Sequence, residues 1–136
     1  MTANEFFRHL LTALAASDRT EFPATHSEIH RAFLGVLREI RKPEIQAQLA
    51  IEDLIDIDYD PLYGRSRWFD RALTRAQRDR IISFPNPSYD TIKIKYEPEA
   101  ARASLDKLHT HETILTLAEV FARRLTPQTK EQLANS

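Results

Sequence analysis

Only two glycines, Gly35 and Gly64, occur among the 136 residues of this chain. Loops that hold nucleotide phosphates need several glycines, because a residue without a side chain lets backbone N–H groups approach the phosphate closely. A Walker loop, a dinucleotide-binding fingerprint and the Gly-x-Ser-x-Gly elbow of many hydrolases are therefore excluded. Gly35 falls inside a predicted helix, where it costs about 1 kcal/mol relative to alanine. Close packing against another backbone would explain its presence there.

Apolar residues at helical spacing predict a mainly helical fold. Thr2 and Glu5 form the capping-box pattern at the start of a helix that we expect over 3–16. A second helix is predicted to begin near Thr25, again at the start of a capping-box pattern. It is expected to end before Pro43, because a proline disfavours helical geometry in the residue that precedes it.

Three further helical segments are expected, over 44–51, 66–79 and 98–125. In the last of these regions the apolar stripe changes direction along the helix, which predicts either a bend or a break near 109–113 or packing against two partners at once. The wide apolar face of this C-terminal region fits either packing in the core or a homodimer interface.

Two segments show the alternation of apolar and polar residues that is typical of a half-buried strand. The first covers 54–60, where aspartates alternate with isoleucine and tyrosine. The second, 91–96, follows a short apolar run at 81–84 and a proline-rich turn at 85–87, and the two runs predict a β-hairpin with a longer loop. The expected fold is mainly α with a small antiparallel β-hairpin or sheet, in a single domain over 1–136.

Residues 65–80 carry an unusual concentration of positive charge. Six arginines stand against two aspartates there, which gives a net charge of +4. At about 100° per helical residue, four of the arginines fall within about 80° of one another, and the apolar residues cluster on a different side. These four residues, which we call the arginine ridge, are Arg67, Arg71, Arg75 and Arg78. Because such a row of guanidinium groups cannot easily be buried, we expect it to face water, acidic groups or phosphate.

The segment that follows the ridge suggests a family. A helix, then Ile-Ile-Ser-Phe, a loop and Thr-Ile-Lys-Ile-Lys-Tyr make up residues 66–96, and this order resembles the second half of a winged-helix DNA-binding domain. In that family a recognition helix is followed by a two-stranded wing. The resemblance implies a winged-helix-like portion over about 25–96, with the ridge facing the major groove or its phosphates. It also implies that Lys93 and Lys95 lie on the wing, near the DNA backbone.

The sequence departs from the family pattern in two places. Asp79 and Arg80 stand where the family often has a small residue or glycine before the first wing strand, and an acidic strand-like segment precedes the helix in place of a compact helix-turn-helix pair. The acids just upstream of the ridge are Glu52, Asp53, Asp56, Asp58 and Asp60. Ion pairs between the ridge and these acids, within one chain or between two copies, would account for both the acidic and the basic cluster without DNA. Exposed ion pairs are individually worth less than about 1 kcal/mol.

Other patterns do not mark a catalytic or metal site. His26 and His30 have the spacing of two metal-binding imidazoles, but the sequence indicates no third ligand, and the glutamate of the zincin motif is displaced. The alternating aspartates that begin at Asp56 mimic the start of a calcium loop, yet Pro61 stands where that loop needs its turn glycine. We therefore expect no metal and no cofactor, and we favour a protein that is not an enzyme over an enzyme whose site comes together only in the folded chain.

The overall charge favours a local interaction surface. Lysine and arginine total 19 and aspartate and glutamate total 20, whereas a non-specific nucleic-acid binder is usually strongly basic. Arginine outnumbers lysine 14 to 5, which favours specific contacts with carboxylate or phosphate. The absence of cysteine and of a long apolar segment predicts a soluble cytoplasmic protein without membrane contact.

Two functions follow from these observations. The first is a small regulatory or accessory protein that contacts double-stranded DNA through the helix 66–79 and the hairpin. The alternative is a protein–protein interaction module, or a subunit of a larger assembly, that binds an acidic protein surface through the ridge or the C-terminal helix and has no nucleic-acid contact. Fold alone does not choose between them.

Overall fold

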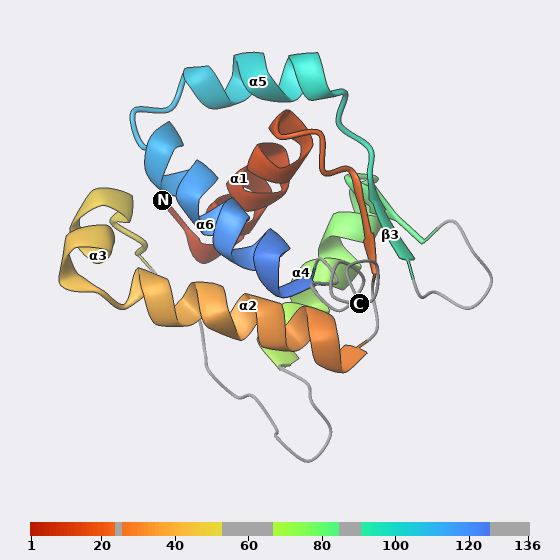
Figure 1. The fold of residues 1–136 in the computed structure, drawn as a ribbon, viewed down its shortest axis with the longest axis horizontal. Helices are drawn as coiled ribbons and strands as arrows, with labels where there is room; N and C mark the ends of the chain where they lie inside the picture. The colour runs from red at the N-terminus through yellow and green to blue at the C-terminus, as the bar shows by residue number, and fades with distance from the viewer. Residues whose placement is uncertain (24–25, 53–66, 85–90, 126–136) are drawn as a thin grey trace, which may run out of the picture.

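A computed structural model describes residues 1–23, 26–52, 67–84 and 91–125 of the chain (Figure 1). These residues form a mainly helical fold with a small antiparallel sheet, as expected from the sequence. In chain order the elements are α1 (Ala3–Ala16), β1 (Glu21–Pro23), α2 (His26–Ile40), α3 (Pro43–Leu49), α4 (Arg67–Arg78), β2 (Ile82–Ser83), β3 (Thr91–Ile94), α5 (Pro98–Asp106) and α6 (His111–Leu125).

Several predictions fall outside the described residues. They are the strand over 54–60, the acids from Asp53 to Asp60, the turn at 85–87 and the cap residue Thr25.

The capping box predicted for the first helix is confirmed. The Thr2 side chain accepts a hydrogen bond from the Glu5 N–H at 3.1 Å, and the Glu5 carboxylate accepts one from the Thr2 N–H at 3.4 Å. Two backbone donors that the first helical turn leaves unpaired are satisfied in this way. The cap explains why α1 begins at Ala3, as the sequence predicts.

The sheet is antiparallel and has the strand order β1-β3-β2. Ile82 of β2 pairs with Ile94 of β3, so the strands of the predicted hairpin form, although β3 ends at Ile94 and not at Tyr96. On its other side β3 pairs with β1, where Phe22 lies opposite Ile92. The third strand, β1, is an addition to the hairpin expected from the sequence.

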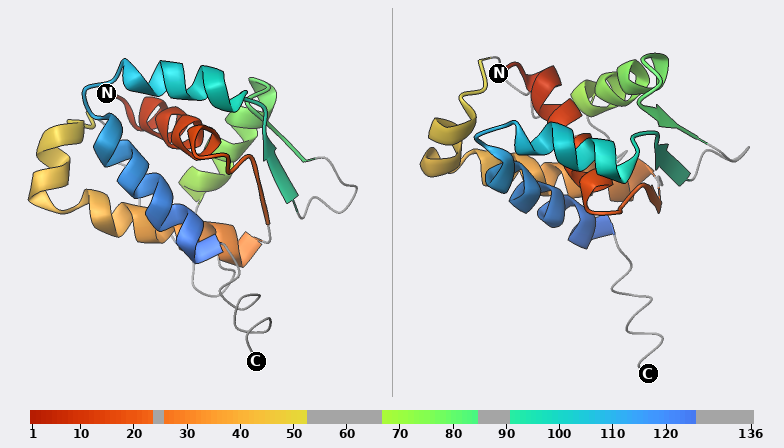
Figure 2. Two further views of the ribbon diagram at one scale, coloured as in Figure 1. Left: turned by 45° about the horizontal axis from the view of Figure 1, so that its top comes forward. Right: turned by 90° about the horizontal axis from the view of Figure 1, so that it is seen from above.

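The helices form successive layers around α1. Figure 2 (left) shows α5, α1, α6 and α2 one below another, and the packing contacts join α1 to α5 and α6 and join α6 to α2. Large apolar side chains fill the spaces between these layers. The following are almost completely buried: Phe6, Leu10, Leu14, Ile29, Phe33, Ile114 and Phe121. This shared core leaves α4 and the hairpin at one side of the molecule.

The C-terminal helical region is broken, as its change of apolar direction predicts. α5 ends at Asp106 and α6 begins at His111, so the break comes slightly before the expected 109–113. Ile114, Leu117 and Phe121 of α6 are buried in the chain's own core. Packing within the chain therefore accounts for the wide apolar face, and a homodimer through this helix remains a prediction.

Gly35 is closely packed, but against a side chain and not against the backbone that the sequence suggested. A Cβ atom built at Gly35 on α2 would lie 2.7 Å from Cδ and 2.9 Å from Cζ of Arg124 on α6. These distances are too short for a real side chain, so the Arg124 side chain rests where an alanine methyl group would stand. Gly35 thus leaves room on α2 for the Arg124 side chain of α6.

Candidate nucleic-acid interface

Helix α4 is fixed to the body of the protein by aromatic side chains. Phe69 is fully buried, and its ring lies 4.3 Å from that of Phe33 on α2 and 5.6 Å from that of Phe7 on α1. Trp68, which is partly buried, stacks parallel to Phe33 at 5.6 Å. Aromatic pairs at these separations contribute about 0.5–1.5 kcal/mol beyond the area that they bury. The inner face of α4 is therefore held by two other helices.

The arginine ridge lies on the exposed part of the same helix. All four of its residues, Arg67, Arg71, Arg75 and Arg78, are exposed, as expected. Within the ridge, Nε of Arg71 donates a weak hydrogen bond of 3.4 Å to the backbone oxygen of Arg67. The described part of the segment predicted over 66–79 is thus a helix, Arg67–Arg78, with separate packing and charged sides.

The two aspartates of this segment have partners outside the ridge. Oδ1 of Asp70 lies 3.2 Å from Nε2 of His30, a residue of α2 whose side chain is fully buried. Asp79 accepts a hydrogen bond of 2.5 Å from Arg8 of α1. Among the described residues, no ion pair joins Arg71, Arg75 or Arg78 to a carboxylate. Asp70 and Asp79 therefore do not neutralise Arg71, Arg75 or Arg78.

The end of α4 is built as a left-handed cap. The Ile81 N–H donates to the Ala76 carbonyl at 2.9 Å and the Arg80 N–H donates to that of Gln77 at 3.1 Å, which is the bonding pattern of a Schellman motif. Arg80 has φ +61°, the conformation that such a motif requires at this position and that glycine adopts most easily. Arg80 is exposed, and it is a candidate contact residue that the helical pattern did not select, because it lies beyond the helix.

The hairpin follows this cap directly (Figure 2, right). Lys93 and Lys95 of the hairpin segment are both exposed, whereas Ile92 and Ile94 are buried, so the predicted alternation is confirmed. Lys93 pairs across the sheet with Glu21 of β1, whose negative charge lies beside it. The hairpin thus offers one lysine with an acidic neighbour, and Lys95 just beyond the end of β3.

The backbone ties Lys95 to the end of α4. Its N–H donates to the carbonyl oxygen of Ile81 at 2.8 Å, and Ile81 directly follows Arg80. The structure therefore brings the C-terminal end of α4 and the base of the hairpin together.

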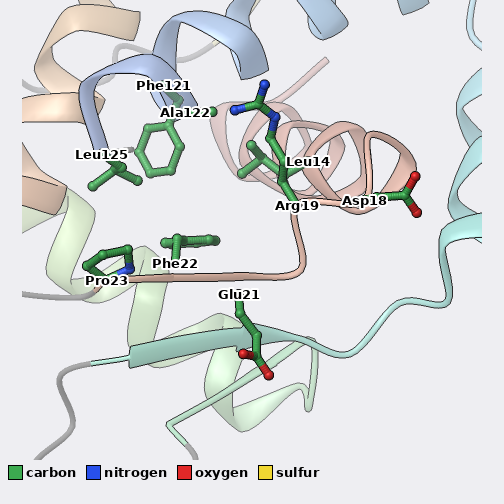
Figure 3. A pocket seen from close by; sticks show the side chains of 9 residues that line it. All are labelled: Leu14, Asp18, Arg19, Glu21, Phe22, Pro23, Phe121, Ala122 and Leu125. Atoms are coloured by element: carbon green, nitrogen blue, oxygen red, sulfur yellow. The ribbon is translucent and has the colours of Figure 1, made fainter. Parts of the chain in front are cut away.

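A separate cavity of about 330 Å³ lies between the C-terminal ends of α1 and α6 and strand β1 (Figure 3). Its walls include the apolar side chains of Phe22, Phe121 and Leu125. Two of the charged residues beside it form ion pairs within the chain: Arg19 contacts Glu119 at 3.1 Å, and Asp18 accepts a hydrogen bond of 2.9 Å from Arg102. The cavity is lined mainly by apolar groups, and we assign no ligand to it.

The structure describes only part of the histidine pair singled out in the sequence. His30 is buried beside the Phe69 ring, at 5.0 Å between ring centres, and it faces Asp70. The side chain of His26 lies outside the described part of the chain. No group of three or more metal-binding side chains comes together in the described ranges. His30 therefore belongs to the packing of α4 on α2.

Comparison of the chain with protein-family models, curated proteins and solved structures found no match. Among the described helices, none is both long enough and apolar enough to cross a membrane.

Proposed function

We propose that this chain is a small, non-enzymatic, winged-helix-like regulatory or accessory protein that contacts double-stranded DNA through α4 and the hairpin. The observation that carries the proposal is the separation of charge on α4. Its exposed edge holds the arginine ridge, while Asp70 and Asp79 are engaged by His30 and Arg8. The order of helix and antiparallel hairpin supports the same interpretation.

Arginine suits this role chemically. Its planar guanidinium group donates two parallel hydrogen bonds to a phosphate and stays charged at every physiological pH. An α-helix with its side chains is about 10–12 Å wide, which matches the major groove of B-form DNA at about 12 Å. Each phosphate that an arginine neutralises releases condensed cations, and this release drives affinity. An arginine that reaches the O6 and N7 atoms of guanine would add sequence preference.

The net charge of the whole chain is close to zero, so binding to DNA depends on where the arginine ridge lies. With a net charge of −1, the protein has no general attraction for a polyanion, so binding must be oriented by a local basic surface. The absence of cysteine accords with a reducing compartment, and we place this activity in the cytoplasm.

A binding titration with a fluorescently labelled random-sequence duplex tests the proposal. The wild-type chain is expected to bind at low salt and to lose affinity steeply as salt rises. An Arg71→Glu, Arg75→Glu double variant should lose most of this binding. The matched control is Arg38→Glu, Arg41→Glu, which changes the net charge equally at two exposed arginines at the end of α2. This control should bind nearly as the wild type does, and circular dichroism should show that all three proteins are helical.

Two results would count against the proposal. Absence of wild-type binding even at low salt would remove DNA as the partner and favour an acidic protein surface on the same ridge. Equal loss of affinity in the two double variants would show that total charge, and not the ridge, governs binding.

A further inference from the structure

Three of the helices in the described ranges end in a left-handed residue that is not glycine. The residues are Asp18 after α1, Ala50 after α3 and Arg80 after α4, with φ values of 60°, 48° and 61°. In this conformation the Cβ atom of an L-residue approaches the following carbonyl oxygen, so any side chain costs free energy that glycine avoids. A residue other than glycine at such a position therefore calls for a reason.

The backbone around Arg80 does not supply that reason. The two hydrogen bonds of the cap use only main-chain atoms, and its apolar contact is made by Ala76 and Ile81, which are both buried. Glycine would form the same turn with less strain. The guanidinium group of Arg80 is therefore not required by the cap itself.

The comparison with Asp18 shows what an internal reason looks like. The Asp18 carboxylate accepts a hydrogen bond of 2.9 Å from Arg102, so its side chain joins α1 to α5. Arg80 has no corresponding ion pair with a carboxylate in the described residues, and it is exposed. Its acidic neighbour, Asp79, is already bound by Arg8. Within the described ranges, the positive charge of Arg80 therefore has no carboxylate partner.

We propose that Arg80 is a phosphate contact that extends the arginine ridge from α4 onto the base of the hairpin. This inference rests on the proposed function. Arg80 comes two residues after Arg78, and the next residue, Ile81, accepts the hydrogen bond from the Lys95 N–H. Along the backbone, Arg80 thus lies between the last residue of the ridge and the residue that is hydrogen-bonded to the hairpin lysine. Because it would bind the DNA backbone, the contact adds affinity and salt dependence without sequence preference.

Replacing Arg80 by glycine separates its two effects. Arg80→Gly should raise the urea midpoint of unfolding, because the left-handed conformation no longer carries a side chain. The same variant should bind the duplex more weakly, and the slope of log K against log salt should fall by about 0.9, the value for one lost phosphate contact. Opposite changes in stability and binding are not expected of a residue whose role is only structural.

Two control variants complete the experiment. Arg80→Lys keeps the charge and the strain, so it should keep the salt slope of the wild type. Ala50→Gly relieves the same kind of strain at the end of α3, so it should raise the urea midpoint and leave DNA binding unchanged.

The inference fails in three distinguishable ways. An unchanged salt slope in Arg80→Gly, together with lost binding in Arg71→Glu, Arg75→Glu, would refute the role of Arg80 and leave the proposed function intact. A lower urea midpoint in Arg80→Gly would show that the arginine side chain stabilises the end of α4. Absence of wild-type DNA binding would overturn both proposals together.

Discussion

The charged residues of α4 and of its C-terminal end lie in different environments. The two aspartates are paired with residues of other helices and the ridge arginines are exposed, and this difference produces the candidate surface. Asp70 is partly buried beside the imidazole of His30, whose own side chain has no access to solvent. A buried polar ring is stable only with a polar partner, so the Asp70 carboxylate serves as the partner of the buried His30 ring. Asp70 therefore supports packing, although it lies on the helix that carries the ridge.

The close approach at Gly35 yields a prediction about stability. Gly35→Ala adds a methyl group inside α2, which favours the helix by about 1 kcal/mol, but the Arg124 side chain must move to make room. The side chain of Arg124 is long and exposed, so this movement costs little. We expect the free energy of unfolding to rise by less than about 1 kcal/mol, as measured by urea denaturation.

The control for this prediction removes the Arg124 side chain that lies against Gly35. In an Arg124→Ala background the same Gly35→Ala change should give the full gain of about 1 kcal/mol. A loss of more than about 1 kcal/mol in the wild-type background would mean that groups stiffer than Arg124 close the space above Gly35.

At the scale of elements, the fold depends on how α4 is attached. Phe69 contacts Phe33 and Phe7, so one side chain joins α4 to both α2 and α1. Trp68 lies on the same junction, and it is the single tryptophan of the chain. Tryptophan emission therefore reports on whether α4 is docked.

Removal of this anchor should weaken the whole fold. Phe69→Ala deletes a fully buried ring and leaves a cavity, which is expected to lower the free energy of unfolding by about 3–5 kcal/mol. Urea titrations followed by Trp68 fluorescence and by circular dichroism measure the loss. A decrease below about 1 kcal/mol would contradict the packing of α4 described above.

The elements that the sequence predicts best are those with a local cause. The capping residues and apolar stripe of α1 lie within the element, so its bounds are correct at both ends. β1 was missed because its three residues, Glu21, Phe22 and Pro23, become a strand only through pairing with β3, about seventy residues later in the chain. A short segment that contains proline has no periodic pattern from which this pairing could be predicted.

At the scale of the whole molecule, the candidate site also combines features with a local cause in the sequence and features that depend on distant parts of the chain. Helical periodicity alone predicts the arginine ridge, because its residues share one helix. The partners of Asp70 and Asp79 come from α2 and α1, and the left-handed cap at Arg80 depends on buried contacts of Ala76 and Ile81. These features arise from tertiary packing, so a single sequence does not reveal them.

A cross-linking experiment tests the central claim, that the outer edge of α4 contacts DNA, most directly. The chain has no cysteine, so a cysteine introduced at one position is unique. Thr74 is exposed on α4 between Arg71 and Arg78, and Ser104 is exposed on α5. A photoactivatable group attached to Thr74→Cys or to Ser104→Cys reports whether duplex DNA lies beside either position.

We expect the Thr74→Cys protein to form a covalent adduct with duplex DNA at low salt and to form little at high salt, because the contact is ionic. The Ser104→Cys protein should form no adduct under either condition. Equal adducts from the two positions, or an adduct from Ser104→Cys alone, would contradict the assignment of α4 as the DNA-contacting surface.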